Sequence, residues 1–100
     1  MTPATTPPDL AAIELVAVLQ ALSDPVRLEI VRQLAACPGE LSCGAIALPV
    51  SKSTASHHLK ALACAGVTVE REEGTRKYIR LRRPDIDERF PGLLDAVLRG

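Results

Sequence analysis

Hydroxyl, imidazole and ammonium groups gather in one short stretch of the sequence. The polar side chains of this stretch are Ser51, Lys52, Ser53, Thr54, Ser56, His57, His58 and Lys60. Ala55, Leu59 and Leu62 recur among them at i, i+4 and i+7, which predicts a helix with one apolar face and one polar face. Short polar side chains on such a helix can bond phosphates and base edges in the major groove of DNA, which is about 12 Å wide. A polar face that is merely solvated is the alternative.

A basic hairpin is predicted directly after this helix. Gly66 is placed to end the helix in the left-handed conformation, with Val67 as its apolar partner, and residues 67–71 and 76–81 have the composition of strands about a turn at 72–75. Residues 51–83 contain eight basic and three acidic residues, whereas residues 1–50 contain two and five, and residues 84–100 contain two and four. The chain has no net charge, yet its positive charge lies in one third of its length. This distribution favours a nucleic-acid partner.

The basic residues of the hairpin differ in their expected roles. Arg76 and Lys77, beside the turn, are expected to contact phosphates or the flanking minor groove, with ordinary strand-surface charges as the alternative. The others are as compatible with phosphate contact as with surface ion pairs: Arg80, Arg82 and Arg83 could pair with Glu70, Asp85 or Asp87.

Caps, helix breakers and apolar spacing predict the remaining elements. A first helix runs from a cap at Asp9 to about Leu22, and a second, with Asp24 as cap and Pro25 at its first position, stops at residues 37–39. A short apolar helix covers about residues 42–48. The last helix is indicated by apolar residues at i, i+3, i+4, i+7 and i+8, namely Phe90, Leu93, Leu94, Val97 and Leu98. Residues 1–8 are expected to be a disordered lead. Residues 9–100 are expected to form one mainly α domain with a small β-hairpin, in the order α-α-α-α-β-β-α of a winged helix-turn-helix.

The first predicted helix is apolar on two sides. Leu15, Val18, Leu19 and Leu22 fall on one side, and Leu10, Ile13, Val16 and Ala17 fall nearly opposite. A helix of this kind must be covered twice, and in a chain of 100 residues a second subunit is the expected second cover.

These segments resemble the ArsR/SmtB family of bacterial winged-helix repressors. The resemblance rests on residues 21–31 (ALSDPVRLEIV), residues 51–62 (SKSTASHHLKAL) and the hairpin sequence of residues 72–78 (EEGTRKY), and it covers roughly residues 10–98. It implies a homodimer built from the first and last helices. The expected interface residues are Leu10, Ile13, Val16, Ala17, Phe90, Leu94 and Val97.

The resemblance also implies two places where a metal could bind. One family site has a Cys-x-Cys pair after Glu-Leu, but here Glu40-Leu41 is followed by Ser42-Cys43-Gly44, so serine and glycine occupy the ligand positions. The other uses Asp and His on the last helix, where this chain has acidic residues but no histidine. Because zinc-like metals prefer Cys and His donors, no metal site and no cofactor are predicted. A metal-responsive repressor with an atypical site is an alternative.

The three cysteines have no framework spacing, which predicts a cytosolic protein with reduced thiols. Cys37 and Cys43 flank the turn before the helix that begins at Ser51. They are either small apolar packing residues or a thiol switch whose oxidation moves that helix. Cys64 is expected to pack. No apolar run approaches the roughly 18 residues of a membrane span, and the first residues lack the pattern of a signal peptide.

The sequence therefore predicts a cytoplasmic, nucleoid-associated repressor and not an enzyme, because no nucleophile–base–acid set is evident. It is expected to bind a pseudo-palindromic DNA operator as a homodimer. Thiol oxidation is a candidate signal for its release from DNA. Neither a membrane nor a tightly bound small molecule is expected as a partner. The expected DNA contacts are Ser51, Lys52, Ser53, Thr54, Ser56, His57, Lys60, Arg76 and Lys77. A winged helix that binds only another protein is the competing hypothesis, and the exposed basic hairpin argues against it.

Overall fold

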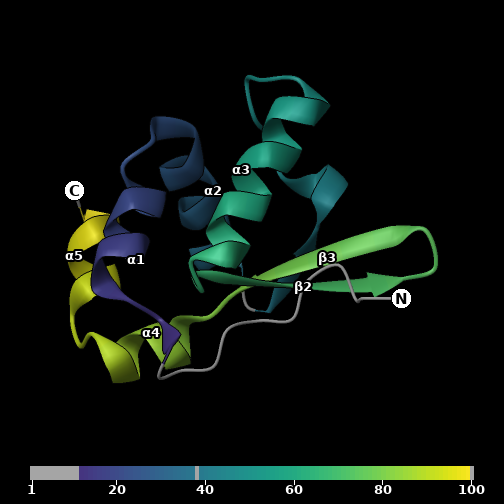
Figure 1. Ribbon diagram of the computed structural model, residues 1–100. Coiled ribbons are helices and arrows are strands. Elements are labelled where there is room, and N and C mark those ends of the chain that lie inside the picture. The colour runs from purple at the N-terminus through teal and green to yellow at the C-terminus, as the bar shows by residue number, and fades with distance from the viewer. Residues whose placement is uncertain (1–11, 38, 100) are drawn as a thin grey trace.

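The computed structural model describes residues 12–37 and 39–99, and it shows a helical body from which a β-hairpin extends (Figure 1). In chain order the elements are α1 (Leu15–Leu22), α2 (Pro25–Ala35), β1 (Glu40–Ser42), the 3-10 turn η2 (Cys43–Ala45), α3 (Lys52–Cys64), β2 (Thr68–Glu73), β3 (Arg76–Leu81), α4 (Arg83–Arg89) and α5 (Leu93–Arg99). The predicted lead, the predicted cap Asp9 and the predicted interface residue Leu10 lie outside the described residues. The mainly α winged helix-turn-helix is confirmed, with differences in four elements. Helix α1 begins only at Leu15, with Glu14 in the cap position, so the predicted start at Asp9 is wrong and Ile13 precedes the helix.

Helix α2 begins where its cap was predicted. The Oδ1 atom of Asp24 accepts hydrogen bonds from the amides of Val26 at 2.8 Å and Arg27 at 3.1 Å. Pro25 occupies the first turn, where its missing N–H leaves no hydrogen bond unmade. These contacts hold the pKa of the Asp24 carboxyl below its ordinary value, mainly through the Arg27 amide, with the Val26 amide and the nearby His58 adding to the effect.

Helix α3 has the predicted start and stop. The Ser51 hydroxyl caps it by accepting from the Thr54 amide at 3.3 Å. At the other end Gly66 has φ +87°, its amide donates to the Ala63 carbonyl at 3.1 Å, and the Val67 amide donates to the Leu62 carbonyl at 3.0 Å. These two bonds form a Schellman motif, which turns the chain from α3 into the hairpin.

The hairpin is longer and its turn tighter than predicted. Strands β2 and β3 pair from Thr68 opposite Leu81 to Glu73 opposite Arg76, so the turn contains only Gly74 and Thr75. Gly74 has φ +63°, a conformation that two-residue hairpin turns require at their first central position. The sheet has the order β1-β3-β2, because β1 pairs with the free edge of β3.

The predicted helix at residues 42–48 is wrong. Residues 40–42 form the edge strand β1, with Leu41 opposite Ile79, and only residues 43–45 form a helical turn. The Ala47 amide donates to the side-chain oxygen of Gln33 at 3.1 Å, so it is not available to extend that turn. The strand pairing with β3 and the hydrogen bonds to Gln33 of α2 are therefore formed in place of a helix. Gly44 and Pro49 also have low helix propensity.

The predicted last helix, over residues 90–98, corresponds to α5 at Leu93–Arg99, but the short helix α4 before it was not predicted. Pro84 lies in the first turn of α4, and Gly92, with φ +84°, separates α4 from α5. Phe90 therefore ends α4 and does not belong to the helix that carries Leu94 and Val97.

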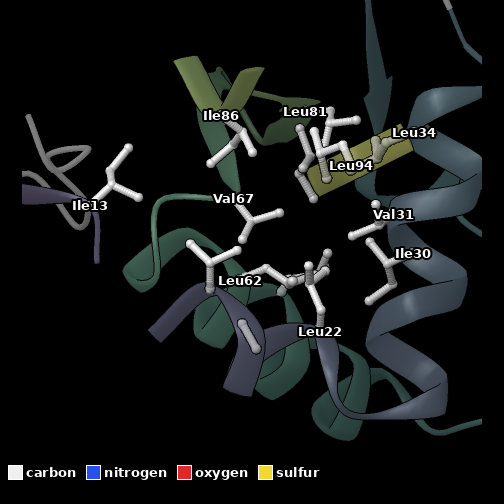
Figure 2. Packing of buried hydrophobic residues seen from close by; sticks show 14 of the residues in the cluster. Ile13, Leu22, Ile30, Val31, Leu34, Leu62, Val67, Leu81, Ile86 and Leu94 are labelled. Atoms are coloured by element: carbon white, nitrogen blue, oxygen red, sulfur yellow. The ribbon is translucent and has the colours of Figure 1, made fainter. Parts of the chain in front are cut away.

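The core is made of aliphatic side chains from all the helices and from the hairpin (Figure 2). Ile13 and Leu94, both predicted in a dimer interface, are 1% and 0% exposed within the single chain. That part of the prediction is corrected, because these side chains pack in the core and offer no surface to a partner. Ile13 fills the space over Gly66, where an added Cβ would lie 2.8 Å from its Cγ1 atom.

Among the described residues no helix is long and apolar enough to cross a membrane.

Candidate nucleic-acid interface

The polar face of α3 is exposed as predicted. Ala55 is partly covered, and Leu59 and Leu62 are buried, which fixes the rotation of the helix on the core. The opposite side chains all reach solvent: Ser51, Lys52, Ser53, Thr54, Ser56, His57 and Lys60. In Figure 1 the amino-terminal end of α3 lies at the top of the molecule, and the tip of the hairpin lies at its right edge.

Two residues of this face have internal roles. The Ser51 hydroxyl caps α3 and also donates to the Thr54 hydroxyl at 3.0 Å, so contact with DNA would compete with these bonds. The ring of His58 is half-buried, and its Nδ1 atom is buried without a hydrogen-bond partner in the described part of the chain. His58 lies edge-on to His57, with ring centroids 5.7 Å apart. Of the two, His57 is the one that faces solvent.

The hairpin presents its two predicted contacts unequally. Arg76 is exposed at the turn, and in the described ranges 12–37 and 39–99 it makes no ion pair. The Nζ atom of Lys77 lies 3.7 Å from the Oε1 atom of Glu70 on the paired strand, whose side chain is 8% exposed. A phosphate would have to compete with Glu70 for Lys77 but not for Arg76.

Sequence reasoning missed the electrostatic role of Arg71. Its guanidinium stacks over the ring of Tyr78 at 4.6 Å, pairs with Glu73 at 2.7 Å and bonds Glu40 of β1. The hydrogen bond from Arg71 lowers the pKa of the Glu40 carboxyl, and these acidic partners raise the pKa of Arg71. The missing signal was β1 itself: without that strand, nothing in the sequence places Glu40 beside the hairpin.

The structure divides the basic segment into two groups. Arg82, which is 6% exposed, pairs with Asp85 at 2.9 Å, and Arg83 pairs with Asp87 at 3.4 Å and with Asp95. The question left open for these two arginines is thereby answered in favour of ion pairs. Within the basic segment of residues 51–83, the exposed cations that form no ion pair with a described residue are Lys52, Lys60, Arg76 and Arg80.

A second exposed surface lies on α1. Val16 is 65% exposed, Leu19 45% and Leu15 44%, whereas Ala17 is partly covered. Phe90 and Val97, near the end of the chain, are partly covered as well. In Figure 1, α1 and α5 occupy the same end of the molecule, opposite the hairpin tip.

All three cysteines are free, and Cys37 and Cys43 are half-buried whereas Cys64 is exposed. The Cys37 thiol lies 3.8 Å from the Glu40 carbonyl, to which it donates a weak hydrogen bond. The prediction that Cys64 packs inside the protein is wrong, because Cys64 is exposed. Within the described residues no three His, Cys, Asp or Glu side chains are grouped as metal ligands would be.

A three-helix core with an exposed polar helix and a basic two-stranded wing defines the winged helix-turn-helix class. Residues 22–72 match the family model of a helix-turn-helix domain. The chain is 39% identical over 82 residues to the HTH-type transcriptional regulator YceK of Bacillus subtilis, covering 80% of this chain and 82% of that protein. It is 44% identical over 64 residues to the HTH-type transcriptional regulator Rv2034 of Mycobacterium tuberculosis, covering 62% of this chain and 58% of that protein.

One solved structure is similar to this chain in both fold and sequence. It is the solution structure of the homodimeric winged helix-turn-helix DNA-binding domain Mb0332 from Mycobacterium bovis, described as a possible ArsR-family transcriptional regulator. The two are 34% identical, with a TM-score of 0.69, over 97% of this chain and 91% of that one. The chain belongs to the helix-turn-helix transcriptional regulators of the ArsR type, a family of DNA-binding regulators and not of enzymes.

Proposed function

We propose that the protein is a homodimeric repressor that binds a pseudo-palindromic operator in the bacterial cytoplasm. Each subunit places α3 in the major groove, and the hairpin tip lies over the flanking phosphates or minor groove. Two α3 helices related by a twofold axis contact half-sites about 34–36 Å apart, one turn of the duplex.

The observation that carries this proposal is the composition of the exposed face of α3. Seven polar side chains reach solvent while the apolar face of α3 packs on the core, which fixes the direction in which they point. Ser51 and Thr54 share the capping bonds, whereas Ser56, His57, Lys52 and Lys60 project from the helix into solvent. The exposed cations Lys52, Lys60 and Arg76 add a sequence-independent attraction for phosphates. A protein-binding winged helix would instead present apolar side chains at these positions.

The homodimer is supported by the apolar surface of α1. Three large apolar side chains on one short helix are each more than 40% exposed: Leu15, Val16 and Leu19. A contiguous exposed apolar patch of this kind is typical of a protein–protein interface. The domain from Mycobacterium bovis, described as homodimeric, has the same fold and a third of its residues in common.

Selection of bound sequences from random duplexes tests the proposal. We expect enrichment of an inverted repeat whose half-sites lie one helical turn apart, together with affinity that falls steeply as salt rises. Enrichment of no sequence, or of a single unrepeated half-site by a monomer, would contradict it. Mapping the bound positions on the genome, beside the protein's own gene first, would then identify the regulated genes.

Thiol oxidation stays a prediction as the releasing signal. What supports it is position: Cys37 and Cys43 flank β1, are free and half-buried, and precede the segment that leads into α3. Operator binding before and after diamide, in the parent and in Cys37→Ser and Cys43→Ser, decides the question. Equal binding by reduced and oxidised parent protein assigns both cysteines to packing.

A further inference from the structure

A cavity of about 500 Å³ lies between the segment that follows β1 and the first half of α3. Its apolar walls include Ile46, Leu48, Val50 and Leu59, and Lys52 and Ser56 of α3 also line it. Pockets that hold small organic ligands have volumes of about 300–1,000 Å³ and combine apolar walls with a few polar groups. This cavity matches them in size and in chemistry.

One wall of the cavity, at Ala47, is fixed to α2 by two hydrogen bonds. The side-chain amide of Gln33, on α2, donates to the Ala47 carbonyl at 2.7 Å and accepts from the Ala47 amide at 3.1 Å. Both backbone polar groups of Ala47 are thus hydrogen-bonded to one side chain of α2, which fixes this segment relative to that helix. A preformed site loses little conformational entropy when a ligand binds.

The charges around the cavity select the kind of ligand. None of its lining residues is acidic, and Lys52 is the cation among them. Lys52 is exposed and makes no ion pair with any residue in the described part of the chain. A molecule with an apolar body and one carboxylate would bury the body against Ile46 and Leu59 and place its charge beside Lys52 and the Ser56 hydroxyl.

We propose that this cavity binds a small apolar carboxylate, and that the bound carboxylate competes with DNA. The competition rests on the proposed function, because Lys52 and Ser56 belong both to the cavity and to the face of α3 expected to enter the major groove.

Calorimetric titration of the DNA-free protein with octanoate tests the binding site by itself. We expect octanoate to bind, while acetate, which lacks the apolar body, and octylammonium, which has the opposite charge, do not. Ala47→Phe fills the cavity from its exposed rim and should abolish octanoate binding. Ala45→Phe, two residues away, exposed and outside the cavity, should leave it unchanged.

The charged group is tested by a second matched pair of variants. Lys52→Gln should weaken octanoate binding by about two- to fivefold, the range of an exposed ion pair, and should not change the binding of octanol. Lys60→Gln lies on the same helix but outside the cavity and should change neither. No octanoate binding by the parent, or equal binding by Ala47→Phe, would overturn the site.

The competition is measured as operator affinity at an octanoate concentration ten times its dissociation constant. Competitive binding raises the apparent dissociation constant of the operator by at least about tenfold, and Ala47→Phe should not show this rise. Octanoate binding without that rise overturns the competition. A protein that binds octanoate but no DNA sequence overturns the proposed function and leaves the cavity assignment intact.

Discussion

Ser56 and His57 are neighbours on the exposed face of α3, and under the proposed function they meet base edges in the major groove. We expect Ser56→Ala and His57→Ala each to weaken operator binding by about 1–3 kcal/mol, the range of a direct base contact, and to leave binding to random DNA nearly unchanged. Fluorescence anisotropy with operator and with scrambled duplex measures the two affinities. Equal losses on both duplexes would mean that these side chains contact phosphates.

Arg76 and Lys77 are expected to contact the DNA backbone and therefore to act on every sequence alike. Each alanine variant should weaken operator and scrambled DNA together and lower the slope of log affinity against log salt by about one unit. The loss should be smaller for Lys77, because it gives up Glu70 when it binds a phosphate. Arg99→Ala, an exposed arginine on α5, is the control and should not alter the slope.

Asp24 contributes to stability in a way that depends on pH. Its folded pKa lies below the ordinary value of 3.8, chiefly because the Arg27 amide donates to the carboxylate. Its contribution is therefore complete above the unfolded pKa and is lost as the pH falls through the lower folded value. We expect Asp24→Ala to lower the urea midpoint at neutral pH, and the difference from the parent to shrink below about pH 4.

The control for this experiment is Asp24→Asn, which keeps a good capping acceptor and removes the charge. It should retain most of the stability at neutral pH and show less dependence on pH than the parent. A difference between parent and Asp24→Ala that stays constant down to pH 2 would contradict the assignment.

At the scale of elements, the sequence was a good guide wherever a local interaction fixes a boundary. Asp24, Ser51 and Gly66 are such residues, because each satisfies or terminates the backbone bonds of its own helix. Their partners lie within four residues, so the signal is contained in a short window of sequence.

The elements that were predicted wrongly depend on distant partners. Strand β1 pairs Leu41 opposite Ile79, and η2 stays short because the Gln33 side chain hydrogen-bonds both the N–H and the C=O of Ala47. Arg83 also pairs with Asp95, 12 residues further along the chain, a partner that sequence reasoning did not name. The exposed face of α3 was predictable because helical periodicity alone sets it, whereas the burial of Leu94 depends on the whole core.

Gly66, at the end of α3, lies against Ile13, the first buried residue in the described part of the chain. Gly66→Ala would adopt an unfavourable φ of +87° and place its Cβ atom 2.8 Å from the Cγ1 atom of Ile13. We expect a loss of more than about 1 kcal/mol in the free energy of unfolding. Denaturant titration measures it.

Two other glycines separate the causes of that loss. Gly74→Ala has the positive φ without a nearby atom, so it should lose less, and Gly44→Ala has neither, so its stability should stay the same or rise slightly. Equal losses at Gly66 and Gly74 would show that the contact with Ile13 relaxes without cost.

At the scale of the whole molecule, the fold separates two surfaces along its length. Residues of α3 and the hairpin tip supply polar and cationic groups, and α1 supplies exposed aliphatic groups at the other end (Figure 1). If two copies associate through α1, each keeps its α3 and hairpin free for DNA. Because the two surfaces are separate, a substitution on α1 can disrupt the dimer without changing the residues proposed to contact DNA.

The dimer prediction can therefore be tested without unfolding the chain. Val16→Glu with Leu19→Glu changes side chains that are 65% and 45% exposed, so the subunit should stay folded while the charge prevents association. We expect sedimentation to show a monomer with unchanged helix content, and operator affinity to fall because one half-site is lost. Leu94→Ala, at a position 0% exposed, should instead cost about 2–5 kcal/mol of folding stability. A double glutamate variant that sediments as a dimer would exclude α1 from the interface and move the search to the partly covered Phe90 and Val97.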